Sequence, residues 1–246
     1  MPIADKALIE KIVYAHGGKV LWNSVDWIEA DISANGFLFK AKHVQPLVHV
    51  RMRASAREPH FLFYDYPEPG QTAELIGNQE VRVTGKDGSL LHSRTLPRTA
   101  FHGIRRNFWW DDLDFIYFAG YATWNYLTTP FLFMREGFTF ENCGQRQTPA
   151  GTFLCLDATF PEDLPAHSRR QTFYFDENSL LRRFDYTAEV VGGWAHAAHF
   201  CDDYRDFGGL RFPARRRVRP IFFNRVLSGP TLVAIDTHDI RVIRKA

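Results

Sequence analysis

The sequence contains few cysteines, and they are widely spaced. Cys143, Cys155 and Cys201 are the only three, and no two of them form a C-x-x-C pair. An odd, sparse set of this kind indicates neither a disulfide framework nor a zinc cluster of the usual spacing. We therefore interpret each cysteine as a small, buried apolar side chain.

An excess of one charge is also absent. The chain has 30 Lys and Arg residues against 28 Asp and Glu residues, a formal charge of +2. Proteins that bind phosphate backbones are usually more basic, so we predict no nucleic-acid partner. One short basic run is present, and its strand-like pattern would turn successive residues to opposite faces. We interpret this run as a solvated or salt-bridged strand; it comprises Arg215, Arg216, Arg217 and Arg219.

The sequence also lacks a clean apolar segment of membrane-spanning length. Residues 115–133 are long enough, but polar residues and Pro130 interrupt them, and their rings are not confined to the two ends. We predict no transmembrane segment. The first 18 residues, MPIADKALIEKIVYAHGG, lack a basic region followed by an apolar stretch, and they predict a short amphipathic helix that ends at Gly17 and Gly18. We therefore expect a cytoplasmic protein.

Aromatic residues, by contrast, are abundant and concentrated. In residues 108–133, FWWDDLDFIYFAGYATWNYLTTPFLF, 11 of 26 positions are Phe, Tyr or Trp. The pattern predicts a helix that Asp111 or Asp112 caps and that ends near Leu127, before Pro130. After its first turn this helix is apolar on nearly all sides, which is typical of a buried helix. It could be plain core, or its rings could line a ligand cavity.

Alternating apolar and polar residues dominate the chain after residue 24 and predict about ten antiparallel strands. No crossover helix is long enough for a parallel sheet, and a sheet of this width must curl. We predict one α+β domain over residues 1–246: a curved, unclosed antiparallel β-barrel, a meander wrapped around the aromatic helix, with a short N-terminal helix. The expected strands are 25–34 and 37–42 around Asn35-Gly36, 80–84 and 89–94 around Asp87-Gly88, 138–147, 152–160, 171–175, 180–190, 196–206, 211–223 and 232–243.

The order of these elements, with AHGG after the first helix and a tryptophan at position 22, resembles the lipoprotein-carrier (LolA/LolB-like) fold. That resemblance implies an unclosed barrel with a hydrophobic cavity. Three longer strings resemble an uncharacterised family of bacterial proteins: YFAGYATWNYLTTPF (117–131), HSRRQTFYFDENSLLRRFDYTAEVVGG (167–193) and GGLRFPARRRV (208–218). By fold, the chain is also similar to the violacein-pathway enzyme that rearranges an indole intermediate, which implies that such a cavity can host chemistry without a cofactor.

Several histidines are candidates for proton transfer. His196 and His199 have a spacing that binds metals on a helix, but in a strand they point to opposite faces, so we predict no metal site there and expect one of them to face inward. His167 lies where a loop enters a strand, a position from which it could reach a cavity mouth. His102, just before the aromatic helix, is a weaker candidate on similar grounds.

Strand parity divides residues 181–190, LRRFDYTAEV, into two faces. Arg183, Asp185 and Glu189 share one face with Thr187, and the apolar residues share the other. The charged face could form exposed ion pairs with the next strand. If it faces the cavity instead, Arg183 could clamp an anion and Asp185 or Glu189 could act as a general base.

From these patterns we predict that the protein binds a small hydrophobic or aromatic molecule and performs acid/base chemistry on it without a cofactor or metal. His167 or His199 would move the proton and Asp185 would tune it. A non-catalytic cytoplasmic carrier or sensor of a hydrophobic ligand is the alternative, and a partner-binding protein, such as a homodimer formed through exposed rings, is a third. The expected ligand-binding residues are Tyr117, Tyr121, Trp124, Asn125, Arg183 and Tyr186.

Overall fold

The alternating segments form one large, open antiparallel sheet in the computed structural model, which describes residues 3–148 and 151–245. It has 14 strands among these residues, more than the ten expected, in the order β6-β5-β4-β3-β2-β1-β14-β12-β11-β10-β9-β8-β7, with β13 paired to β12. The strands are β1 (Val25–Asn35), β2 (Leu47–Ser55), β3 (His60–Tyr64), β4 (Thr72–Ile76), β5 (Glu80–Thr84), β6 (Leu90–Thr95), β7 (Thr139–Thr148), β8 (Gly151–Thr159), β9 (Arg170–Phe175), β10 (Leu181–Thr187), β11 (His196–Phe207), β12 (Leu210–Phe222), β13 (Arg225–Val226) and β14 (Val233–Arg244).

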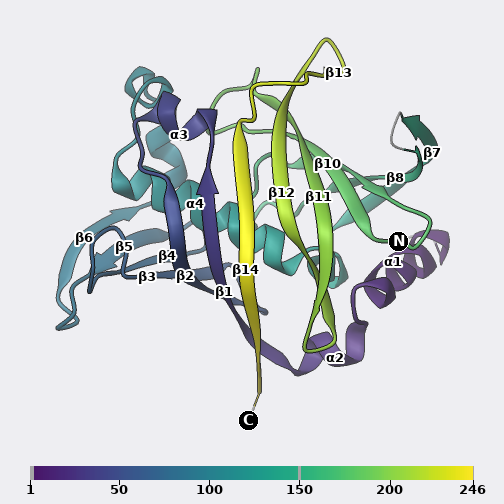
Figure 1. Cartoon of the computed structure of the whole chain (residues 1–246), viewed down its shortest axis with the longest axis horizontal. Helices are drawn as coiled ribbons and strands as arrows, with labels where there is room; N and C mark the ends of the chain where they lie inside the picture. Colours follow the sequence, from purple (N-terminus) through teal and green to yellow (C-terminus); the bar gives the residue numbers. More distant parts are fainter. Residues whose placement is uncertain (1–2, 149–150, 246) are drawn as a thin grey trace.

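Two meanders meet in the middle of this sheet. β1 to β6 extend from the centre to one edge, and β7 to β12 return from the other edge, so that β14 pairs with β1. The connection between the two edges carries η1 (Pro97–His102), η2 (Ile104–Asn107), α4 (Asp112–Thr128) and η3 (Phe131–Met134). Figure 1 shows α4 passing behind β1, β14 and β12, across the face of the sheet. This path places the predicted aromatic helix against the inner face.

Helix α4 begins and ends close to where the sequence predicts. The Asp111 carboxylate accepts the backbone N–H of Asp114, and the Asp114 carboxylate accepts that of Asp111, which forms a capping box. Fourteen of its 17 residues are buried, as the all-round apolar pattern requires. Gly120 permits the close approach to β4, because a Cβ atom there would lie 3.2 Å from the Leu75 side chain.

The N-terminal helix α1 (Ile3–Ala15) is present as predicted and is followed by α2 (Lys19–Ser24). Gly17 and Gly18 both have positive φ, and a Cβ atom on Gly17 would lie 2.5 Å from the carbonyl oxygen of Gly209. Trp22 is buried and stacks on Phe131 of η3 with 4.2 Å between ring centroids. The N-terminal segment is thereby fixed against the chain that leaves α4.

Residues 37–42, predicted as the second strand of a hairpin, form helix α3 (Phe37–Lys42) instead. The Asn35-Gly36 pair does not make a two-residue hairpin turn. Gly36 has a φ of 139° and lies against Leu232, whose carbonyl oxygen would be 2.5 Å from an added Cβ. The chain therefore bonds to the segment before β14, through the backbone N–H groups of Phe37 and Leu38, rather than folding back on β1.

The three cysteines are unpaired, and the helices are short or polar. Cys155 and Cys201 are buried as expected, whereas Cys143 is partly exposed on edge strand β7, and all three are free thiols. None of the helices in the described part of the chain has the length and hydropathy needed to cross a membrane.

Candidate functional site

Two tyrosines of α4 hold His167 between them. His167 lies in the segment that enters β9 and is buried. The Tyr121 hydroxyl lies 3.2 Å from its Nδ1 atom and the Tyr126 hydroxyl lies 2.7 Å from its Nε2 atom. A neutral imidazole has one donor and one acceptor, so one phenol donates to the ring and the other accepts from it.

Burial keeps the His167 imidazole and the Tyr121 and Tyr126 hydroxyls uncharged at neutral pH. Desolvation, with a smaller contribution from Arg98, lowers the pKa of His167 to about 3. Burial raises the pKa of the Tyr121 and Tyr126 hydroxyls well above the usual value for a phenol. The three side chains therefore form a neutral hydrogen-bonded network.

Residues of the inner sheet face complete an aromatic cluster around His167. Tyr186 of β10 stacks on the imidazole with 4.0 Å between centroids and 6° between planes. His199 of β11 is 0% exposed and contacts Phe184 and Tyr126 through its ring. Neither ring nitrogen of His199 has a hydrogen-bond partner within the described part of the chain. Burial lowers the pKa of His199 well below its usual value.

Arg216 of β12 carries a buried positive charge into the same region. Only 5% of the residue is exposed, and its guanidinium donates to the Tyr126 carbonyl at 2.8 Å and to the Cys201 sulfur at 3.1 Å. It also lies 5.1 Å from the centre of the Tyr126 ring. Across residues 3–148 and 151–245, no carboxylate forms an ion pair with Arg216. The interpretation of the basic run as solvated or salt-bridged is therefore wrong at this position.

The space between α4 and this part of the sheet is small. A cavity of about 10 Å³ lies there, enough for roughly one water molecule. Of the predicted ligand rings, Trp124 lines a separate and larger hollow of about 170 Å³ beside η3. The cavity is lined by Asn125, Tyr126, Thr129, Phe160, His167, Gln171, Phe173, Leu181, Phe184 and Arg216.

The side chains of the other predicted ligand residues of α4 form hydrogen bonds to other groups of the protein. The Tyr117 hydroxyl donates to the Asn78 side chain at 2.8 Å, and the Trp124 indole N–H donates to the Ser55 carbonyl at 2.9 Å. The Asn125 amide donates to two backbone carbonyls at 2.8 Å each. Its Oδ1 atom has no partner among the described residues, although it is buried.

Arg183 and Asp185 lie on the outer face of β10, on the opposite side from His167. Their side chains form a bidentate pair with both N–O distances at 2.7 Å, and Tyr174 donates to the same carboxylate. Desolvation raises the pKa of Asp185, although the hydrogen bond and charge of Arg183 act in the opposite direction. Within β10, parity separates the two faces correctly, and the charged face is not the one that meets α4. Glu189 lies beyond the end of β10 and pairs with Arg98 at 2.6 Å. His196 and His102 are exposed and outside the cluster.

Comparison with known proteins identifies the architecture. No family model matches the chain, and no curated protein does. A LolA superfamily protein from Nitrosomonas europaea superposes with a TM-score of 0.56 at 11% identity, over 98% of this chain and 94% of that one. The fold is LolA-like. A domain from Vibrio parahaemolyticus described as an outer membrane lipoprotein-sorting protein gives 0.55 at 10% identity over 97% and 93%, and a DUF1329 family protein from Desulfovibrio piger gives 0.53 at 12% over 96% and 92%.

Two residues of the aromatic cluster region, Tyr126 of α4 and Arg216 of β12, were not among the predicted site residues. Tyr126 falls in the predicted aromatic helix without a role of its own, and Arg216 falls in the basic run that we interpreted as solvated or salt-bridged. The signal for Arg216 is strand parity, which places it on the same face as Ala214 and Val218, both buried. For Tyr126 the sequence signal is weaker: it follows the predicted ligand residue Asn125 directly. In the structure it lies on the side of α4 that meets β10 to β12.

Proposed function

We propose that this protein binds a hydrophobic molecule with one anionic group, such as a carboxylate, and that Arg216 contacts this group. The observation that carries the proposal is the buried guanidinium of Arg216, which has no acidic partner among the residues that the structure describes. Removing a charge from water without pairing it costs several kcal/mol. An anionic ligand would offset that cost, and a planar guanidinium binds a carboxylate through two parallel hydrogen bonds.

The apolar part of the ligand would lie between α4 and strands β9 to β12. Phe160, Phe173, Leu181 and Phe184 line the cavity there, and Asn125 Oδ1 offers an unsatisfied acceptor. Because the closed cavity holds only about 10 Å³, binding requires an open state in which α4 or these side chains move apart. The LolA-like fold supports the proposal by analogy alone.

The test compares dodecanoate with dodecanol, which have the same alkyl chain and differ in charge. Lipid-stripped protein is titrated with each by calorimetry. We expect dodecanoate to bind more tightly, and Arg216→Met to weaken its binding by about 10-fold or more, because a charged hydrogen bond contributes about 1.5–3 kcal/mol. Arg216→Lys should retain part of the preference, and native mass spectrometry of the unmodified protein provides a measurement that needs no variant.

Arg215→Met is the matched control, because Arg215 is the neighbouring residue and is exposed on the opposite face of β12. It should leave both affinities unchanged. Equal affinity for the acid and the alcohol, or a preference that survives in Arg216→Met, contradicts the proposed role of Arg216. Failure of both molecules to bind contradicts the proposed pocket.

Acid/base chemistry on the bound molecule is the second candidate, and the Tyr121–His167–Tyr126 relay is the observation that favours it. The phenol that accepts from the imidazole could give its own proton to a basic atom of the ligand, while the imidazole N–H replaces that proton and the other phenol reprotonates the imidazole. A proton from the ligand or from water would then neutralise the phenolate that remains. The analogy with the violacein-pathway enzyme favours the same reading. Mass spectrometry of the recovered ligand separates the candidates: a carrier returns it unchanged, whereas an enzyme converts it, and His167→Gln should stop conversion while binding continues.

A further inference from the structure

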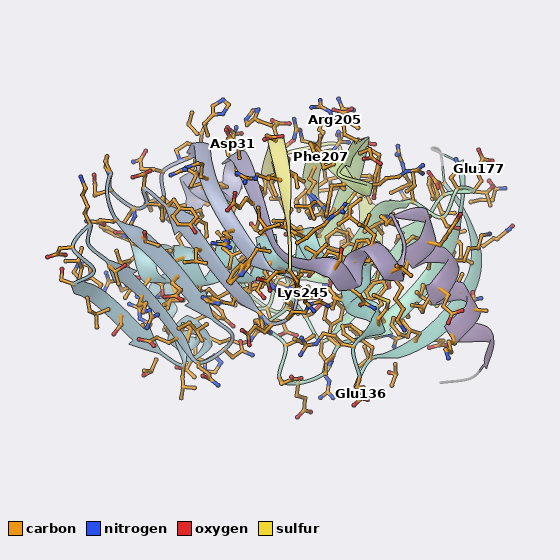
Figure 2. All side chains as sticks on the ribbon, turned by 90° about the horizontal axis from the view of Figure 1, so that it is seen from below. Asp31, Glu136, Glu177, Arg205, Phe207 and Lys245 are labelled. Carbon is orange, nitrogen blue, oxygen red and sulfur yellow. The ribbon has the colours of Figure 1, made fainter. Side chains whose placement is uncertain are left out.

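Two histidines and an aspartate that take no part in the aromatic cluster meet on the outer face of the sheet. Asp31 lies on β1, His49 on β2 and His238 on β14, and one ligand atom from each lies within 4.8 Å of the others. Asp31 points outward because its neighbours Ala30 and Ile32 are buried on the inner face. Figure 2 labels Asp31 near the upper margin of the molecule.

Both histidines are brought to this point by irregularities in the strands that flank β1. The β1–β2 register shifts between Ile32 and Ala34, which leaves His49 as an extra residue with a φ of 49°. The β1–β14 register shifts between Asp31 and Ile32, which leaves His238 as the extra residue. Such β-bulges re-aim side chains. Two of them, on both sides of the same stretch of β1, turn both imidazoles toward Asp31.

The contacts within the cluster are close. His49 Nδ1 lies 3.1 and 3.2 Å from the two Asp31 oxygens, and the rings of His49 and His238 stack with 4.0 Å between centroids. Ser33 connects the two bulges, since its hydroxyl oxygen accepts the backbone N–H of His49 and lies 2.9 Å from His238 Nε2. Partners of this kind fix the orientation of ligating histidines.

We propose that Asp31, His49 and His238 form a binding site for a divalent transition metal ion of the zinc class. Two imidazoles and a carboxylate are the donors that Zn²⁺ binds at ~2.0–2.2 Å, and the ion would replace the proton between His49 and Asp31. Three protein ligands leave at least one position for water or an added ligand. Because imidazole is a poor ligand for Mg²⁺ and Ca²⁺, the site selects against those ions.

The surface around the cluster gives an ion access to it. A hollow of about 530 Å³ lies beside it on the outer face, and Asp31 is one of its lining residues. Arg51 and Arg241 also line this hollow. Glu29 and Asp239 line it as well, so with Asp31 the hollow has three carboxylates against these two guanidinium groups, which favours the approach of a cation.

The experiment uses metal-stripped full-length protein titrated with Zn²⁺ by calorimetry, and with Co²⁺ followed by its visible absorption spectrum. We expect one Zn²⁺ per chain with a micromolar or tighter dissociation constant, and a cobalt spectrum typical of four-coordinate nitrogen and oxygen ligation. Mg²⁺ at the same concentrations should give no heat of binding. Failure of Zn²⁺ to bind overturns the proposal.

Ligand variants locate the binding. His49→Asn, whose side chain tolerates the left-handed backbone at this position, and His238→Ala should each weaken Zn²⁺ binding by about 100-fold or more, since losing even an outer partner of a ligand costs about 10–100-fold. His92→Ala is the control, because His92 is an exposed histidine on edge strand β6 with no part in the cluster. Zn²⁺ affinity that persists in both ligand variants overturns the assignment. Thermal unfolding confirms that each variant is folded.

Discussion

His16, His167 and His199 are buried as neutral imidazoles, and this makes stability depend on pH. Burial lowers the pKa to about 4 for His16 and about 3 for His167, and well below its usual value for His199. The unfolded chain therefore binds more protons than the folded one below about pH 6.5. The stabilisation is fully present above that pH and declines as pH falls toward the folded values, by up to ~1.4 kcal/mol per pH unit for each histidine.

We therefore expect the free energy of unfolding, measured by denaturant titration, to be several kcal/mol lower at pH 5 than at pH 7.5. At pH 5 most carboxylates are still ionised, so histidines dominate the difference. His167→Gln should reduce the difference, whereas His92→Ala, at an exposed position, should not change it. An unfolding midpoint that is the same at both pH values would show that these imidazoles are not held neutral by the fold.

Individual residues were the least predictable part of the site. Strand parity predicts that one of His196 and His199 faces inward, but not which one. The structure shows that the buried residue is His199. The sequence did not determine whether the charged face of β10 meets solvent or the cavity. Alternation separates the two faces of a strand but does not say which of them packs against a helix. Arg216 was missed because a run of arginines suggests solvent, although its strand neighbours on the same face are apolar.

At the scale of elements, α4 depends on a charged cluster at its N-terminus. Asp114 is completely buried and pairs with Arg94 and Arg106 at 2.6 Å each. We expect Asp114→Asn to lower the free energy of unfolding by ~2–4 kcal/mol, because both guanidinium groups would lose their buried anion. Thermal or denaturant unfolding measures this. The exposed neighbour Asp112 provides the control: a loss in Asp112→Asn as large as in Asp114→Asn would contradict the role of the buried pair.

Elements were predicted where a clear turn or cap accompanied the periodic pattern. Helix α4, with its cap and its burial, and the strand pairs β5–β6 and β11–β12 follow from local periodicity and turn residues. Strands β2, β3 and β4, of nine, five and five residues, were missed, although β5, also of five residues, was predicted from the Asp87-Gly88 turn that follows it. Residues 37–42 became a helix because contacts with the segment before β14 overrode the turn tendency of Asn35-Gly36.

At the scale of the whole molecule, stability should decrease from the centre of the sheet to its edges. β1 and β14 are paired on both sides, whereas β6 and β7 are edge strands whose side chains are mostly exposed. Hydrogen exchange followed by mass spectrometry should show fast exchange in peptides from β6 and β7 and the slowest exchange in β1, β14 and α4. Equal protection across the sheet would contradict this gradient.

A large, unclosed antiparallel sheet with one long helix was predictable from the alternating segments, the turn residues between them and the aromatic helix pattern. The size of the cavity was not, since it depends on how closely the rings of α4 and the inner sheet face pack. Sequence patterns say which side chains are apolar. They do not say whether those side chains leave room for a ligand.

The pairing of β1 with β14 also sets the order in which the fold can be assembled during translation. Trp27 pairs with Ile243, about 200 residues later in the chain. While the ribosome is still making the second meander, β1 has its partner β2 on one side and an open edge on the other. Until β14 emerges, the nascent chain must keep that edge from pairing with another copy of itself.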